Sequence, residues 1–266
     1  MSISRRSFLT VTPVLLTPVV WPPAQAAQAS PIPQSFPSHS PDLVRDMVGA
    51  SHGNIARVKE LLERHPTLVR ATWDWGFGDW EDAIGAASHV GNREIAELLL
   101  TNGARPTIFS AAMLGQVEVV RAFVSASPGI ESTPGPHGIT LMRHAMAGVP
   151  RAETVVEYLK TLPGADKRPA WQPISAEELA GLVGTYVFGT SGDRQIVIAL
   201  ASSTNANNSA LTFTGPGGSA RGLTHVGDRV FFPVGAPKVQ IRFKVSPGST
   251  TLTVQDGALT MEATRR

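Results

Sequence analysis

The chain has 266 residues, of which 42% are hydrophobic and 17% are charged, and its formal net charge is +2. These values are typical of globular proteins, so they exclude bulk disorder, and the length is sufficient for about two domains. The sequence contains no cysteine, which excludes disulfides, thiolate metal sites and a cysteine nucleophile.

The N-terminal residues predict export. Ser4-Arg5-Arg6-Ser7-Phe8-Leu9 precedes an apolar stretch from Val11 to Trp21 and the triplet Ala24-Gln25-Ala26. This arrangement resembles a twin-arginine signal peptide, which implies a bacterial protein that is periplasmic or secreted. We therefore expect a signal peptide at 1–26 and no stable membrane span after its removal. The loss of Arg5 and Arg6 would leave 21 basic and 21 acidic residues, so the charge gives no support for a nucleic-acid partner.

Residues 27–41 are rich in Pro, Ala and Ser and predict a linker. From Asp42 to Leu162 a helical pattern recurs around Gly53, Gly91, Gly115 and Gly148. The clearest unit is Ala86 to Ala104, in which two short helical patterns meet at a turn. A unit of this size cannot bury its own apolar face, so we expect several units to stack.

The segment 42–162 resembles the ankyrin repeat family in Ala111-Ala112-Met113-Leu114-Gly115 and in Leu99-Leu100-Thr101-Asn102-Gly103-Ala104. The resemblance implies a helical solenoid of about four units that binds a protein partner along a face formed by hairpin fingers and inner helices. The spacing departs from the family's period of about 33 residues. The turn glycines are separated by 38, 24 and 33 residues. This spacing predicts a long hairpin finger, Ala71 to Asp82, before the second unit and a missing finger before the third.

The long finger is the predicted partner-binding site, because tryptophans are frequent binding hot spots. An alternative is a structural role, in which alternating aromatic side chains pack onto the helices, and a carbohydrate platform is a third. Glu81 and Asp82 extend the acidic fringe of the finger. The candidate binding residues are Trp73, Asp74, Trp75, Phe77, Asp79 and Trp80.

Four histidines lie near the turns of the repeat segment: His52, His89, His137 and His144. No zinc-motif spacing connects them, and the ankyrin resemblance implies that they hydrogen-bond neighbouring loops. We therefore expect no metal ligand and no cofactor. The sequence also contains no Gly-x-Ser-x-Gly elbow and no β-lactamase-type Ser-x-x-Lys set, so we assign no catalytic residue and expect no enzymatic activity.

Residues 163–174 predict a second linker, and 175–266 predict a β domain. Ser175 and Glu178 have capping-box spacing ahead of a short helix. The hydrophobic period then changes to two, in about eight short stretches separated by turn signals such as Pro247-Gly248 and Asp256-Gly257. This rhythm predicts an antiparallel meander that closes into a small barrel.

The opening of this domain, Leu179 to Tyr186, loosely resembles the small β domain appended to some bacterial β-lactamase-like hydrolases, and no catalytic residue carries over. The barrel interior is a possible site for one small ligand. In the segment 238–245, Lys238, Gln240, Arg242 and Lys244 alternate with apolar residues, which predicts a strand with one solvated face.

The predicted fold class is therefore multidomain α plus β: an α-helical ankyrin solenoid of about four units, followed by a small antiparallel β-barrel or sandwich. The predicted function is that of an exported bacterial ankyrin-repeat protein that mediates a protein–protein interaction. The alternative is an enzyme-accessory protein, or a small-molecule or lipid carrier that uses the C-terminal barrel.

Overall fold

The computed structural model describes residues 31–266 except 190–191, 193, 202–208 and 217. The predicted signal peptide at 1–26 therefore lies outside the described residues, as does the beginning of the predicted linker 27–41. The chain divides into two compact units, Met1–Ser38 and His39–Arg266. In the described part of the first unit, the Phe36 amide donates to the Pro33 carbonyl (2.9 Å) and closes a turn.

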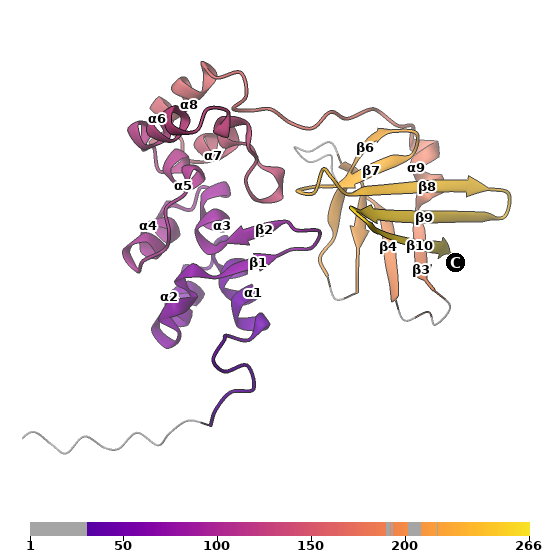
Figure 1. Ribbon diagram of the computed structural model, residues 1–266, viewed down its shortest axis with the longest axis horizontal. Helices are drawn as coiled ribbons and strands as arrows, with labels where there is room; N and C mark the ends of the chain where they lie inside the picture. Colours follow the sequence, from indigo (N-terminus) through magenta and orange to yellow (C-terminus); the bar gives the residue numbers. More distant parts are fainter. Residues whose placement is uncertain (1–30, 190–191, 193, 202–208, 217) are drawn as a thin grey trace, which may run out of the picture. The chain divides into compact units, whose positions relative to one another are not determined.

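Short helices account for most of the segment before the barrel (Figure 1). The α-helices of this segment are α1 (Pro41–Ala50), α2 (Ile55–Arg64), α3 (Ala83–His89), α4 (Arg93–Thr101), α5 (Ile108–Met113), α6 (Val117–Ala126), α7 (Leu141–Ala147) and α8 (Glu153–Lys160). Three 3-10 turns connect them: η1 (Pro66–Arg70), η2 (Ile130–Ser132) and η3 (Pro136–Gly138). A hairpin of β1 (Thr72–Asp74) and β2 (Trp80–Asp82) precedes α3.

The prediction of an ankyrin solenoid is wrong. The helices of this segment have six to ten residues, and no series of equivalent stacked units is evident in the described part of the chain. The physical reason lies in the unequal spacing of the turn glycines. The hairpin β1–β2 fills the long interval before Gly91, whereas only residues 102–107 connect α4 to α5 and leave no room for another hairpin.

The helices bury two apolar clusters, and polar side chains fix where the helices begin. One cluster gathers residues of α1 to α4, including Met47, Leu61 and Leu99, and the other lies among α5 to α8. Helix α3 begins at Asp82, whose carboxylate accepts from the Gly85 amide (2.7 Å) and so satisfies an orphan donor of the first turn. Because Asp82 is also the last residue of β2, this cap fixes the junction between the hairpin β1–β2 and α3.

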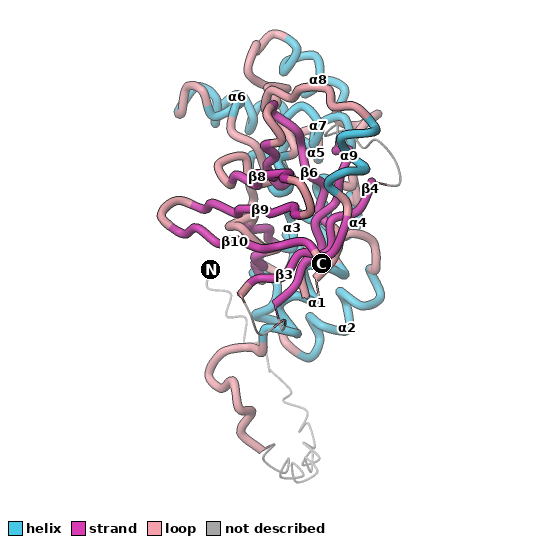
Figure 2. The backbone as a smooth tube through the Cα atoms, turned by 90° about the vertical axis from the view of Figure 1, so that its right-hand side faces the viewer, coloured by secondary structure: helices cyan, strands magenta, loops and turns pink. Residues whose placement is uncertain are grey.

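The C-terminal prediction of an antiparallel barrel is confirmed. The strands in the described residues are β3 (Gly184–Phe188), β4 (Arg194–Leu200), β5 (Ser209–Thr214), β6 (Arg221–Gly227), β7 (Val230–Pro233), β8 (Gln240–Ser246), β9 (Ser249–Asp256) and β10 (Leu259–Arg265). Each strand pairs antiparallel with its neighbours, and β10 pairs with β3 to close the barrel. The consecutive strands β8, β9 and β10 lie side by side in Figure 2.

Apolar side chains from the strands fill the interior of this barrel. The largest fully buried ones include Tyr186 and Phe231, whose rings both contact Phe243 edge to face. Strand β8 shows the predicted alternation, because Ile241 and Phe243 are buried. Gln240, Arg242 and Lys244 of the predicted solvated face are exposed, and the alternation ends at Val245, which is exposed as well.

The short helix before the barrel is α9 (Ala176–Leu182), and the predicted capping box is present. The Ser175 hydroxyl accepts from the Glu178 amide (3.1 Å), and the Glu178 carboxylate accepts from the Ser175 amide (3.4 Å). Within the described residues, none of the helices has the length and apolar character that crossing a membrane requires.

Candidate metal centre

Three histidines and one glutamate converge at the turns of the helical segment. His52 lies in the turn after α1, Glu81 in β2, His89 at the end of α3 and His137 in η3. One ligand atom from each residue lies within 4.8 Å of the corresponding atoms of the other three. Four elements, of which β2 and α3 follow each other in the sequence, therefore bring imidazole nitrogens and a carboxylate to one point.

The centre of the cluster is the carboxylate of Glu81, whose side chain has no solvent exposure. Its Oε1 lies 3.0 Å from His89 Nε2, and its Oε2 lies 3.5 Å from His52 Nε2 and 3.4 Å from His137 Nε2. The indole Nε1 of Trp75 donates a hydrogen bond to Oε2 (2.8 Å). A carboxylate this deeply buried needs such partners, since an isolated buried charge is strongly unfavourable.

Hydrogen bonds at the far side of two rings direct their Nε2 atoms at the cluster. His52 Nδ1 lies 3.2 Å from the Val48 carbonyl and 3.1 Å from the Gly49 carbonyl. His137 Nδ1 lies 2.8 Å from the Asp79 carboxylate. Carbonyl and carboxylate oxygens only accept, so each Nδ1 carries the proton, and in the neutral ring Nε2 keeps its lone pair. This arrangement is typical of histidines that bind metals through Nε2.

His89 and Glu81 each have one buried polar atom without a hydrogen-bond partner among the described residues. These atoms are His89 Nε2 and Glu81 Oε1, which face each other but are not aligned for a hydrogen bond. Buried polar atoms in native structures nearly always have a partner, so an orphaned pair requires an explanation. A cation bound between the two atoms would satisfy both of them.

The cluster also has strongly perturbed protonation equilibria. Burial alone would raise the pKa of Glu81, but the imidazoles of His137 and His89 outweigh it and lower the pKa to about 2. Burial would lower the pKa of His137, but its contacts with Asp79 and Glu81 raise the pKa to about 9. Groups with such perturbations gather at functional sites more often than elsewhere.

A fourth histidine, His144 of α7, lies behind the cluster and is fully buried. Its ring is 6.3 Å from the His89 ring and 4.8 Å from the Phe109 ring, measured between centroids. Burial and then repulsion from His89 lower the pKa of His144 to about 3, so its ring is neutral at physiological pH. His144 is therefore an uncharged neighbour of the cluster.

The donor set fits a divalent transition metal. Imidazole nitrogen and carboxylate oxygen are ligands of Zn²⁺ and of other late first-row ions, which bind them at about 2.0–2.2 Å. Four ligands in a tetrahedron of that size lie about 3.3 Å apart. The separations of Glu81 Oε1 from His89 (3.0 Å) and of Glu81 Oε2 from His137 and His52 (3.4 and 3.5 Å) are near this value. The histidine side chains remain 12–31% exposed, which gives an ion a route to the cluster.

The predicted partner-binding residues of the finger are divided between packing and exposure. Trp73 and Trp75 are half-buried against the helical core, whereas Phe77 packs against the barrel cluster and contacts the Phe213 ring. Trp80 is 61% exposed. The aromatic part of the finger thus packs internally, except for Trp80.

The acidic residues of the finger have separate roles. Asp74 accepts a hydrogen bond from the Gly76 amide (2.8 Å), and Asp79 is buried against His137.

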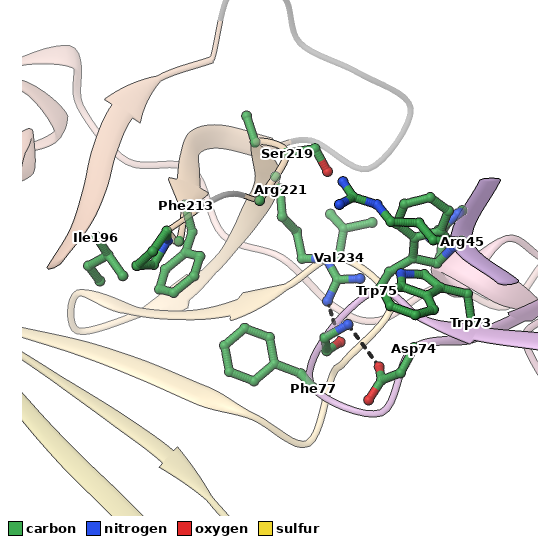
Figure 3. A pocket seen from close by; sticks show the side chains of 17 residues that line it. Arg45, Trp73, Asp74, Trp75, Phe77, Ile196, Phe213, Ser219, Arg221 and Val234 are labelled. Atoms are coloured by element: carbon green, nitrogen blue, oxygen red, sulfur yellow. Dashed lines mark hydrogen bonds between the residues drawn. The ribbon is translucent and has the colours of Figure 1, made fainter. Parts of the chain in front are cut away.

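Trp73, Trp75 and Phe77 line a cavity of about 670 Å³ that also reaches His137 (Figure 3). The finger therefore connects this cavity to the histidine cluster.

Sequence spacing did not reveal the cluster because its four ligands come from four different elements. Zinc motifs are recognised by ligands that are close in the sequence, whereas Glu81 and His137 are 56 residues apart. One signal was present. His52 and His137 each directly precede a glycine, and His89 precedes Gly91 by two residues, so the three histidines occupy similar places at the turns.

A scan against protein-family models finds no match to this chain, and a search of curated proteins finds none either. The assignment of a function therefore depends on the geometry of the cluster.

Proposed function

We propose that this protein binds one divalent first-row transition metal ion, such as Zn²⁺, through His52, Glu81, His89 and His137. The observation that carries the proposal is the convergence of three Nε2 atoms on a fully buried carboxylate. Two of the rings are already held through Nδ1 by oxygen acceptors. The site is thus pre-organised, which reduces the cost of ordering its ligands on binding.

The main alternative is a charge network without a metal. In that arrangement Glu81 serves as the counter-ion of a protonated His137. This alternative accounts for the raised pKa of His137, but within the described residues His89 Nε2 and Glu81 Oε1 have no aligned hydrogen bond, although the two atoms lie 3.0 Å apart. The metal satisfies both atoms, and this favours the metal centre.

The ligand types also favour one class of ion. Ca²⁺ and Mg²⁺ take six or more oxygen ligands in most sites, and the cluster supplies a single carboxylate. Imidazole nitrogens suit Zn²⁺, Cu²⁺, Ni²⁺ and Fe²⁺. We therefore expect tight binding of Zn²⁺ and no measurable competition by a large excess of Mg²⁺.

The test is a calorimetric titration of the full chain with Zn²⁺ after removal of bound metals by a chelator. We expect one ion per chain, and we expect His89→Ala to abolish this binding. His65→Ala is the matched control, because His65 lies outside the cluster and its ring contacts that of His39. Equal Zn²⁺ affinities for the native protein and His89→Ala would overturn the proposal, as would a native protein that binds no ion.

The exported protein-binding function indicated by the sequence stays a prediction. The most exposed aromatic residue of the finger is Trp80, which lies on β2 next to the proposed ligand Glu81. Metal binding and a protein contact at Trp80 are compatible, because the Trp80 side chain is exposed whereas that of Glu81 is buried.

A further inference from the structure

The ligand His137 depends on a neighbouring residue for its position. Its backbone has φ 57°, in the left-handed region that residues other than glycine rarely adopt. The short turn η3 that carries it therefore requires support from outside. The carboxylate of Asp79 supplies this support, because Oδ1 accepts from the His137 amide (2.8 Å) and Oδ2 contacts Nδ1 (2.8 Å).

These two contacts fix both the backbone and the ring of His137. The amide contact holds the strained turn in place. The contact with Nδ1 fixes the tautomer and directs Nε2 toward Glu81, 3.4 Å away. Carboxylates that orient metal-bound histidines in this way strengthen metal binding without touching the ion.

Asp79 is itself held by residues of the barrel. It is only 4% exposed, and Arg221 at the start of β6 places Nη2 2.5 Å from Oδ2. Arg221 also donates through Nη1 to the Gly76 carbonyl (2.7 Å), which fixes the turn between β1 and β2 (Figure 3). Such a charge-assisted hydrogen bond is stronger than a neutral one and holds the buried carboxylate in place.

A glycine in the loop between β7 and β8 completes the enclosure. A Cβ atom added to Gly235 would lie 2.6 Å from Asp79 Oδ2, closer than non-bonded atoms approach. Arg221 and Gly235 thus enclose the carboxylate that orients the histidine. Neither of these two barrel residues belongs to the group of possible metal ligands.

We propose that Asp79 is a positioning residue of the metal centre and that Arg221 and Gly235 of the barrel hold it in place, so that barrel residues set the metal affinity. The inference rests on the proposed metal-binding function. Coupling between two sites is reciprocal, so metal binding in turn stabilises the contacts of Arg221 with the hairpin. In this arrangement the packed barrel holds Arg221 and Gly235 in fixed positions beside Asp79.

The experiment compares Zn²⁺ affinity and the visible spectrum of the Co²⁺-loaded protein in the native chain and two variants. Asp79→Asn removes the charge that orients His137, and we expect an affinity loss of about 10–100-fold with a changed Co²⁺ spectrum. Asp256→Asn is the control. It removes a carboxylate charge at an exposed position at the end of β9, outside the histidine cluster, so we expect the native affinity and spectrum.

A second pair of variants tests the barrel contribution and remains informative if Asp79→Asn does not fold. Gly235→Ala pushes a methyl group against Asp79 and is expected to weaken Zn²⁺ binding at least tenfold. Gly248→Ala is the control, because Gly248 also has a positive φ (76°) but has no atom within 4 Å of its added Cβ. We also expect Zn²⁺ to slow amide exchange at Gly76 to Asp79 in the native protein.

The outcomes separate this inference from the function on which it rests. A native chain that binds no Zn²⁺ overturns the proposed function and this inference together. A native chain that binds Zn²⁺, with folded Asp79→Asn and Gly235→Ala variants of native affinity and spectrum, overturns the positioning role alone.

Discussion

Replacement of Glu81 by glutamine is the most informative single change in the cluster. The substitution retains the size of the side chain and an oxygen that accepts the Trp75 hydrogen bond, but it removes the only negative charge among the proposed ligands. The imidazole of His137 then loses its buried counter-ion, and that of His89 loses its contact with a carboxylate oxygen. The variant therefore separates the effect of the Glu81 charge from that of the size of its side chain.

Two magnitudes follow from this geometry. Removing one member of a buried charge pair costs about 3–5 kcal/mol, which we expect as the loss in the free energy of unfolding of the chelated protein. A unit of this size loses about 2–4 °C in Tm per kcal/mol, so the expected decrease in Tm is about 6–20 °C. The loss of a ligand should exceed the effect of an orienting residue, so we expect the Zn²⁺ affinity to fall by more than about 100-fold.

The assay is urea unfolding followed by circular dichroism, together with Zn²⁺ calorimetry under conditions in which the variant is folded. Glu97→Gln is the control, because Glu97 is an exposed residue of α4 that pairs with Arg93 (3.3 Å), and such a pair contributes at most about 1 kcal/mol. If folded Glu81→Gln binds Zn²⁺ with the native affinity, the carboxylate is not a ligand and the reasoning is refuted.

Three further substitutions separate the metal centre from the rest of the fold. Trp75→Phe removes the donor to Glu81 and is expected to lower the free energy of unfolding by about 1.5–3 kcal/mol, measured by urea denaturation, with weaker Zn²⁺ binding. Tyr186→Phe removes the hydrogen bond to the Leu182 carbonyl (2.7 Å) and should cost about 0.5–1.5 kcal/mol in the same assay. Leu252→Ala opens a cavity in the barrel core and should cost about 2–5 kcal/mol in the free energy of unfolding in the same assay, and an unchanged stability would contradict the packing of Leu252.

The barrel was predictable from the sequence because its signals are local. Alternation with period two appears within each strand, as in Ile241 and Phe243, and turn pairs such as Asp256-Gly257 mark where strands end. The capping box of Ser175 and Glu178 is likewise contained in four residues. The pairing of β3 with β10, which distinguishes a closed barrel from a sandwich, is seen only in the structure.

The helical segment was harder to predict because the sequence pattern of a helical hairpin does not specify how successive hairpins pack on one another. The glycine turns and apolar stripes correctly predict several short helices, but the unequal intervals between Gly53, Gly91 and Gly115 are incompatible with a regular solenoid. A repeat fold requires equivalent interfaces between successive units. Here the hairpin β1–β2 occupies one interval and nothing equivalent occupies the next.

The metal centre was not predictable from spacing, since it exists only after folding. Glu81 appeared in the sequence as one member of an acidic fringe, and its isolation from solvent depends on the surrounding turns. Asp79 likewise became a partner of His137 only through a contact between residues 58 positions apart. Interactions of this kind require the positions of whole elements, which local patterns do not contain.

The most direct test of the central claim is anomalous diffraction from crystals of the chain grown with Zn²⁺, recorded on both sides of the zinc absorption edge. The account predicts one strong anomalous peak per chain that is bonded to His52, Glu81, His89 and His137. A structure with no peak at this position, under conditions in which zinc is present in excess, would contradict it.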